Sequence, residues 1–489
     1  NFTNLTTSLI PLRLKTINTH RVLGCSIYKL RAISLIESIV ICLISYILAL
    51  FIVNDLSYTP IANWVDADIR LSQYKGLILL TALIAILTGC LAGLYPAIRS
   101  TSYAPALVLK GSFGLSPKGK KVRVALIGFQ YTVSIALIIV TLFMGLQNHF
   151  MTSSEQLGFN KDQVAIVNLT PEIYAKHKPQ YIQKLKDYPG IEDVAFSVYE
   201  LSKEDDMIDL EYARHEDKDV FFKVFYASEN FLSVMDIQVE EGRDFTREDL
   251  NKAQSDYIIN PAAERDFHLH PGDRFNDRTV LGVSKDFRFN SCRIASSPFV
   301  FALNNDIPNP KLVSYIRFNS KTNLQEAVAH VRETLKEIDP TFPFEISFYN
   351  TILNNLYQKE QTLGKLISLF GIMAILISIV GVFGLVLFET QYRRKEIGIR
   401  KINGATTGQI LLMFNKTYIR IVSVCFIISI PIAWMGTQQW LENFAYKTPL
   451  HLWVFIVAFL IILSVTIGTV TFRNWQAANE NPVNSVKSE

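Results

Sequence analysis

Residues 364–405 read GKLISLFGIMAILISIVGVFGLVLFETQYRRKEIGIRKINGA, and this segment indicates the architecture of the whole chain. Its first 25 residues contain one charge, Lys365, near the edge. A helix of about 20 such apolar residues spans the core of a bilayer. The basic run that begins at Arg393 follows almost at once, and Lys and Arg collect on the cytoplasmic side of membrane helices. The segment therefore predicts a membrane helix that leads into a short basic helix.

Five other segments are long enough and apolar enough to cross a membrane. They are residues 34–53, 76–98, 124–146, 417–436 and 450–472. Six such runs exclude a single soluble globule, and residues 152–362, which contain no long apolar run, exclude a wholly embedded bundle. The 489 residues are 19% charged, whereas an ordinary soluble domain is about one quarter charged. A net charge of +4 gives no nucleic-acid signal, so we expect no nucleic-acid partner.

Basic residues in short loops predict the orientation of the spans. The basic regions alternate with the spans so that all fall on one side of the membrane. These regions are residues 1–33, 99–123 and 390–416 and the tail after 472. The opposite loops, 54–75 and 437–449, contain fewer Lys and Arg residues. The pattern predicts six crossings, with both ends of this chain in the cytoplasm and residues 148–362 on the other side.

The polar region between the third and fourth spans contains both strand and helix patterns. Strands are predicted at residues 163–169, 191–198, 220–226, 255–260, 279–284, 312–318 and 343–349. Helices are predicted at residues 173–188 and 322–338, the second with Thr322 as its cap. This order favours an α+β fold in one lobe or two small ones. The expected fold class is an α-helical membrane protein with six transmembrane helices and one extracytoplasmic α+β domain.

Few residues of the outer region suggest chemistry. The sequence has no GxSxG, HExxH or CxxC motif, so no catalytic residue is predicted and the chain is not expected to be an enzyme. His268 and His270 could both face one metal ion if they lay on a strand, with Asp266 or Asp273 as a third ligand; a polar turn is the favoured alternative. Five cysteines without a CxxC pair predict no disulfide framework.

The two membrane blocks contain an internal repeat. Residues 13–25 read RLKTINTHRVLGC, and residues 393–405 read RRKEIGIRKINGA, a shift of 380 positions. The identities are Arg13 with Arg393, Lys15 with Lys395, Ile17 with Ile397 and Gly24 with Gly404. Pro105 and Lys110 match Pro482 and Lys487 at a shift of 377. The first two spans therefore correspond to the last two, and by symmetry one helix and one outer lobe are expected before Asn1.

These motifs resemble the FtsX-like/MacB-type family of ABC transporter permeases, in its two-module Bacteroidetes-type form. The segments that carry the resemblance are RRKEIGIRKINGA (393–405), EEGRDFT (240–246) and LYPAIRSTSYAPALVLKG (94–111), and it covers essentially the whole chain. The resemblance implies five parts: a degenerate coupling region (1–33), a first membrane module (34–121), one membrane helix (122–147), a periplasmic α+β domain (148–362) and a second module (363–489) with a coupling loop at 390–416.

Such permeases pair with a separate cytoplasmic ATPase, and the resemblance implies which residues dock on it. The expected coupling residues are Arg393, Arg394, Lys395, Glu396, Ile397, Gly398, Arg400, Lys401 and Gly404. A weaker equivalent is expected at Arg13, Lys15, Arg21 and Gly24, because Thr16, Asn18 and His20 stand where the second module has Glu396, Gly398 and Arg400. The alternative is that these basic residues only anchor the helices to the membrane surface.

The function implied by the resemblance is mechanotransmission in a bacterial inner membrane. ATP hydrolysis by the partner would move the periplasmic domain and drive export of antimicrobial peptides, macrolides or lipoprotein-type substrates. The alternative is an ATPase-driven regulator of cell-wall hydrolases that transports nothing. No cofactor is expected in this chain, which has no GxxxxGK[ST]; ATP and Mg²⁺ belong to the partner. Further expected partners are membrane lipid, a periplasmic adaptor or outer-membrane protein, and a second module in a dimeric arrangement.

Overall fold

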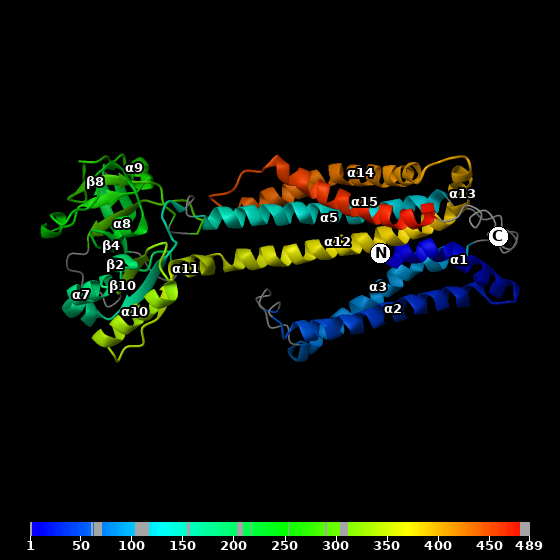
Figure 1. Cartoon of the computed structure of the whole chain (residues 1–489), viewed down its shortest axis with the longest axis horizontal. Coiled ribbons are helices and arrows are strands. Elements are labelled where there is room, and N and C mark those ends of the chain that lie inside the picture. The colour runs from blue at the N-terminus through cyan, green and yellow to red at the C-terminus, as the bar shows by residue number, and fades with distance from the viewer. Residues whose placement is uncertain are drawn as a thin grey trace. The chain divides into compact units, whose positions relative to one another are not determined.

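A computed structural model describes most of the chain. The described residues are 2–59, 62, 71–102, 117–153, 157–202, 209–216, 218–252, 254–288, 291–303 and 312–479. The matches predicted at Pro105, Lys110, Pro482 and Lys487 lie outside them. The chain divides into two compact units, one of residues 1–145, 362–440 and 450–489 and the other of residues 146–361 and 441–449. The first contains long helices and the second an α+β lobe (Figure 1).

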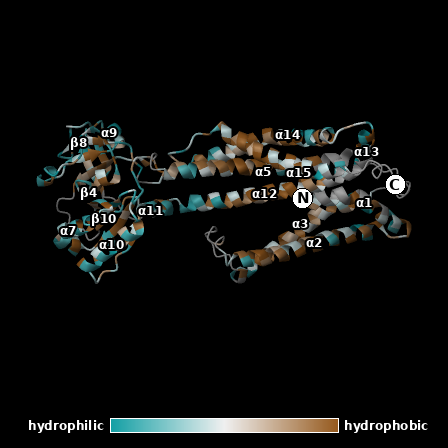
Figure 2. Ribbon diagram, in the orientation of Figure 1, coloured by the Kyte–Doolittle hydropathy of each residue, from teal (hydrophilic) through white to brown (hydrophobic). Residues whose placement is uncertain are grey.

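Among the described residues, six helices are long and apolar enough to cross a membrane. They are α2 (Ile27–Leu56), α3 (Lys75–Ser100), α5 (Pro117–Thr152), α12 (Gln358–Tyr392), α14 (Thr407–Leu441) and α15 (Leu452–Asn479). Figure 2 shows hydrophobic residues along these helices and a more hydrophilic lobe. The six predicted spans and the predicted fold class are therefore confirmed. Helix α14 continues through Pro431, which lies inside it.

The first hairpin, α2 and α3, packs through small residues. A Cβ atom added to Gly93 would lie 2.5 Å from Ser38 Oγ, and one added to Gly89 would lie 2.9 Å from Ile39 Cα. Only residues without a side chain allow this approach. Close packing of α2 on α3 therefore depends on glycine at both positions. A short 3-10 turn, Leu71–Gln73, precedes α3.

The lobe is built on one sheet with the strand order β11-β1-β10-β2-β4-β9-β6-β8-β5, in which β3 also pairs with β4 and β7 with β8. Its strands are β1 (Val164–Leu169), β2 (Ile191–Ser197), β3 (Asp209–His215), β4 (Lys218–Ala227), β5 (Val239–Gly242), β6 (Tyr257–Ile259), β7 (Arg274–Phe275), β8 (Arg278–Ser284), β9 (Phe299–Leu303), β10 (Leu312–Phe318) and β11 (Ile346–Phe348). The pairs β4–β9 and β6–β8 are parallel, and the others are antiparallel. The shared sheet makes one lobe.

In the described part of the lobe, five helices cover this sheet. They are α7 (Pro171–Lys186), α8 (Phe231–Met235), α9 (Pro261–Phe267), α10 (Leu324–Ile338) and α11 (Tyr349–Leu356), with a 3-10 turn at Asp249–Asn251. Helices α7 and α10 lie together on the β1, β2 and β10 part of the sheet (Figure 1). Helix α9 packs on β6, β8 and β9. The lobe therefore has separate cores on different parts of the sheet.

The strands predicted from alternating patterns are confirmed, whereas others were missed. Strand β9 was missed because all five of its residues are buried, so they do not alternate in polarity. Strand β3 was missed because it is a polar edge strand that pairs with β4. The predicted cap of α10 is wrong: Asn323 accepts a hydrogen bond from the Gln325 N–H, while the Thr322 hydroxyl donates to Gly190 O, 3.2 Å away.

Arg243 of the EEGRDFT segment forms an ion pair with a buried carboxylate. Asp249, whose side chain is 3% exposed, accepts hydrogen bonds from Arg243 Nη1 (2.7 Å) and Nη2 (2.9 Å) and from the N–H and hydroxyl of Thr246. The Arg243 guanidinium holds the pKa of the Asp249 carboxyl well below its usual range, because these hydrogen bonds favour the charged form. This network fixes the turn after β5.

Candidate functional site

Residues 393–405, here called the second elbow, connect the two membrane-length helices α12 and α14 through a short separate helix. Helix α12 ends at Tyr392, and α13 (Arg394–Ile402) begins after Arg393. Gly404 ends α13 in the left-handed conformation, with φ of +87°. The N–H of Gly404 donates to Lys401 O (3.0 Å), and the next N–H donates to Arg400 O (3.0 Å). This is the usual glycine-ended helix stop, and a residue with a Cβ atom would be strained there.

A reciprocal cap then starts α14. The N–H of Gln409 donates to Thr406 Oγ1 (3.3 Å), and the N–H of Thr406 donates to Gln409 Oε1 (3.1 Å). Such a capping box satisfies backbone donors that the first turn of a helix leaves without a partner. The turn between α13 and α14 is thus fixed by local hydrogen bonds on both of its sides, and α13 is a short helix between α12 and α14.

Charged side chains form a ladder along the second elbow. Arg393 lies 3.0 Å from Glu389 on α12 and 3.9 Å from Glu396 on α13, measured between nitrogen and carboxylate oxygen. Arg400 pairs with Glu396 at 2.9 Å. The Arg393 guanidinium also lies 5.8 Å from the ring centre of Phe414, and the Tyr418 hydroxyl donates to Glu389 (3.3 Å). The ladder therefore connects α12, α13 and α14.

The surface of α13 presents apolar and basic groups together. Ile397 and Gly398 are buried, but Ile399 is 49% exposed and Ile402 is 66% exposed. Arg400 is also exposed, and Lys401 is half-buried. The backbones of Arg394 and Lys395 lie in α13, but their side chains lie outside what the structure describes. An apolar patch beside a basic side chain is suited to contact with another protein.

The first elbow, residues 13–25, ends with the same glycine helix stop as the second elbow, 380 positions earlier in the sequence. Its residues 13–22 form the end of α1 (Phe2–Val22), and Gly24, just beyond this helix, has φ of +91°. The N–H of Gly24 donates to Arg21 O (3.1 Å), and the next N–H donates to His20 O (3.0 Å). Ser26 caps α2, as Thr406 caps α14. The repeat found in the sequence is thus also a repeat of backbone hydrogen bonds.

The side chains of the first elbow are bound differently. Arg13 makes two hydrogen bonds of 2.8 Å to Glu37 on α2. Arg21 donates to Thr101 O (3.2 Å), at the end of α3. Asn18, where the second elbow has Gly398, is buried and donates to Leu14 O. The side chain of Lys15 lies outside the described part of the chain. The first elbow is therefore fastened to its own hairpin, without the Glu396–Arg400 pair.

A second cluster, here called the outer junction, lies within the lobe unit and joins four chain segments. Its members come from the end of α5, from the loop after β8, from the start of α12 and from the loop between α14 and α15. They are Gln147, Arg288, Cys292, Arg293, Tyr357, Glu360, Phe444, Tyr446 and Thr448. The loop 441–449 belongs to the same compact unit as the lobe, although it connects two membrane-length helices.

Gln147 and Tyr446 hold the outer junction together. The fully buried Gln147 donates to Tyr446 O (3.0 Å) and accepts from the Thr448 N–H (2.8 Å). The Tyr446 hydroxyl accepts from the Ser296 N–H (3.1 Å), and its ring lies 4.1 Å from the Arg288 guanidinium. The loop between α14 and α15 is thus hydrogen-bonded to both α5 and the lobe.

The start of α12 is bound to the same place. Arg293 pairs with the buried Glu360 at 2.6 Å and lies over the ring of Phe444. The Tyr357 hydroxyl accepts from the Cys292 N–H (3.1 Å). Burial raises the pKa of this tyrosine. No motif pointed to these residues, since Gln147 and Tyr446 are 299 positions apart and only folding brings them together.

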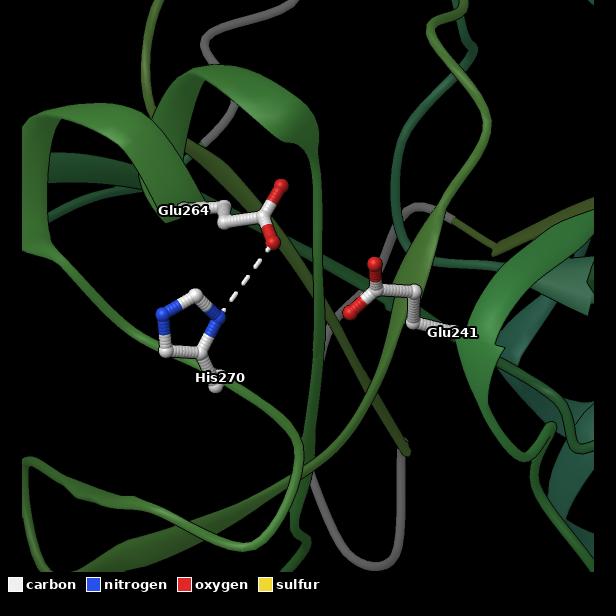
Figure 3. Close-up of side chains that lie close together, drawn as sticks. All are labelled: Glu241, Glu264 and His270. Atoms are coloured by element: carbon white, nitrogen blue, oxygen red, sulfur yellow. Dashed lines mark ion pairs between the residues drawn. The ribbon is translucent and has the colours of Figure 1, made fainter.

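The predicted histidine pair is separated by the fold. His268 ends α9 with φ of +52°, so the two histidines do not share a strand. Figure 3 shows His270 facing Glu264 of α9 and Glu241 of β5. His270 Nδ1 lies 3.5 Å from Glu264, and one ligand atom from each of the three residues lies within 4.8 Å of the others. Asp273 instead accepts from the His270 N–H, and Glu241 and His270 are exposed. The group is a largely exposed polar cluster on the surface of the lobe.

The chain matches a known protein family. The family described as FtsX-like permease C-terminal matches residues 1–105 and 368–482. Each matched region contains one of the elbows and the hairpin after it. The repeat of 380 positions therefore corresponds to two regions matched by one family.

The chain is also similar to macrolide export ATP-binding/permease proteins named MacB. It is 25% identical to the protein of Aggregatibacter actinomycetemcomitans over 212 residues, 41% of this chain and 32% of that protein. It is 25% identical to the protein of Neisseria gonorrhoeae over 223 residues, 43% of this chain and 34% of that protein. The chain spans about a third of the length of these curated relatives.

Among solved structures, the chain is similar to the periplasmic region of MacB from Actinobacillus actinomycetemcomitans. That match has 15% identity and a TM-score of 0.30, and covers 41% of this chain and 94% of the other. A second match is the extracellular domain of the transporter YknZ from Gram-positive bacteria, with 15% identity and a TM-score of 0.28, covering 37% and 99%.

Proposed function

Because residues 1–105 and 368–482 match the FtsX-like permease family and the chain is similar to MacB proteins, we propose that it is the membrane subunit of an ABC transporter in a bacterial inner membrane. A separate cytoplasmic ATPase binds and hydrolyses ATP with Mg²⁺, and its closure moves the second elbow. The observation that carries this proposal is α13: a short helix, ended by hydrogen bonds at Gly404, that exposes Ile399, Arg400 and Ile402.

Two helices, α12 and α14, connect the second elbow along the chain to the outer junction. Helix α12 runs from Gln358, beside Glu360 of the outer junction, to the elbow at Arg393. Helix α14 runs from the elbow to the loop that contains Tyr446. Helices move as rigid rods more easily than they bend, so a displacement of α13 shifts both connections at once. In this proposal the outer junction converts that displacement into a change in the lobe.

We further propose that the elbows are cytoplasmic and that the lobe faces the periplasm. The basic elbows favour this orientation by the positive-inside rule. The exported material is handled at the lobe, either alone or with a periplasmic adaptor. Macrolides are the exported class that the names of the relatives give. Antimicrobial peptides and lipoprotein-type molecules are the other classes that we propose.

The test uses a matched pair of variants. Ile402 and Val22 are equivalent at the shift of 380 and are similarly exposed, at 66% and 62%. We expect the full chain, co-expressed with the ATPases of its own bacterium, to retain one of them through purification in detergent. Ile402→Glu is expected to lose the ATPase, because a charge enters the apolar patch, while Val22→Glu is expected to keep most of it. Equal retention by both variants, or no ATPase bound to the unchanged chain, contradicts the proposal.

A further inference from the structure

A long apolar groove runs along the membrane unit between α5 and α14. Its walls are Val124–Val140 on α5 and Arg420–Ala433 on α14, and its volume is about 890 Å³. With a rise of 1.5 Å per residue, the α5 wall is about 24 Å long. Pockets that hold small ligands have volumes of about 300 to 1,000 Å³. The groove is therefore long and narrow, with the dimensions of an extended hydrocarbon chain.

The groove stays open because its floor is made of small residues. Gly128 has no side chain, and Cys425 Sγ lies 3.5 Å from the place where a Cβ atom would be. Ala136 is half-buried further along the same helix. Phe129, 72% exposed, stands at the rim. A leucine-sized residue at Gly128 or Ala136 would fill this space.

One end of the groove differs from the rest. Arg420 is the charged side chain among the described lining residues, and it is exposed. It forms no ion pair or hydrogen bond with the described part of the chain. A cation at the edge of a hydrocarbon core attracts an anionic lipid headgroup at the membrane surface. The groove thus offers an apolar channel and a positive end, which is the complement of one phospholipid molecule.

We propose that this groove binds an anionic phospholipid, with its acyl chain along α5 and α14 and its phosphate on Arg420. Which leaflet supplies the lipid rests on the proposed function: with the elbows in the cytoplasm, Arg420 lies at the inner leaflet. The bound lipid fills the space between the two helices that lead from the cytoplasmic side toward the outer junction. It therefore sets how closely α5 and α14 approach one another.

The experiment uses the full chain in nanodiscs without any ATPase, so its outcome is independent of the proposed function. The probe is phosphatidylglycerol with a photoreactive group on its acyl chain, and labelled peptides are identified by mass spectrometry. We expect labelling concentrated on residues 124–140 and 420–433. Arg420→Gln is expected to reduce it about fivefold, which is the effect of about one basic residue near an anionic membrane surface. Arg420→Lys is expected to retain it.

Two further variants separate a site from general lipid contact. Ala136→Phe is expected to displace the label from the groove, and Lys416→Gln, an exposed residue of α14 that does not line it, is expected to change nothing. Labelling that is as strong on α2 and α3 and insensitive to Arg420→Gln overturns the proposal.

Discussion

The two elbows end on the same backbone hydrogen bonds, but different groups hold their side chains. Both close on a left-handed glycine, Gly24 or Gly404, and both are followed by a hydroxyl cap. In the second elbow Arg393 binds carboxylates of its own helices, Glu389 and Glu396. In the first, the equivalent Arg13 binds Glu37 on the next helix.

This difference shows that the residues that form the turn of an elbow are not the residues that its surface offers to a partner. Glycine and the cap define the turn, so they persist where the charges do not. The first elbow uses its arginines to hold its own hairpin, through Glu37 and Thr101. The second leaves α13 with a mixed apolar and basic surface. We infer that the two elbows do not contribute equally to coupling.

The largest expected effect comes from exchanging the elbow side chains. Replacing Glu396, Gly398 and Arg400 with the residues of the first elbow (Glu396→Thr, Gly398→Asn and Arg400→His) is expected to weaken ATPase binding more than tenfold. Truncating charged partners at an interface commonly costs about 2 to 5 kcal/mol. The measurement is the affinity of the purified permease for its ATPase.

The reciprocal exchange is the control. Thr16→Glu, Asn18→Gly and His20→Arg in the first elbow are expected to leave ATPase binding the same or stronger. If this exchange weakens binding as much as the first, the elbows couple equally and the inferred asymmetry is wrong.

The hairpin behind the first elbow is expected to depend on small residues. Gly93→Leu is expected to destabilise it by about 3 kcal/mol, because the new side chain would overlap Ser38, and overpacking typically costs about 1 to 3 kcal/mol. Faster alkylation of Cys42 and Cys90, which lie in this hairpin, reports the loosening. Gly76→Leu, in the same helix with no atom within 4 Å, is the matched control. Equal alkylation rates in the two variants would refute the close contact.

The third prediction concerns the ion pair in the lobe between Arg243 and the buried carboxylate of Asp249. The pKa of Asp249 is lowered, so the folded state keeps this carboxylate charged where the unfolded chain, with a pKa of about 3.9, takes up a proton. Its contribution is complete above about pH 5 and is lost as the pH falls further. Asp249→Asn is expected to lower the free energy of unfolding of the lobe by about 2 kcal/mol at pH 7. It is also expected to make the stability of the lobe fall less steeply as the pH is lowered. Hydrogen exchange of the lobe measures both; an unchanged pH profile would contradict the assignment.

The smallest expected effects on stability come from replacing Arg13 and its equivalent Arg393. Arg13→Met is expected to cost less than about 1 kcal/mol, because Arg13 and Glu37 are 52% and 42% exposed. Arg393→Met is expected to cost about 1.5 kcal/mol, because its partner Glu389 is 17% exposed and its ring contact with Phe414 is also lost. Thermal unfolding of each variant in the same detergent gives the order. The reverse order would mean that exposure does not govern these pairs.

Much of this architecture follows from local sequence, because apolar length and basic flanks are local properties. The apolar run at 364–388 and the basic residues after it predicted a membrane helix that leads into a short basic helix. The Arg13–Glu37 pair was not predicted, because the two residues lie 24 positions apart on different helices. The outer junction was not predictable either, because a glutamine, a cysteine and a tyrosine in separate segments carry no motif. Strand β9 was not predicted, because in a fully buried strand apolar and polar residues do not alternate.

Photo-crosslinking from equivalent positions tests the central claim most directly. A benzoylphenylalanine at position 399, where Ile399 is 49% exposed on α13, is compared with one at position 19, its equivalent in the first elbow. With the ATPase present, the unequal-coupling account predicts a strong crosslink from position 399 and a much weaker one from position 19. Equal crosslinks from both positions, or none from position 399, would contradict it.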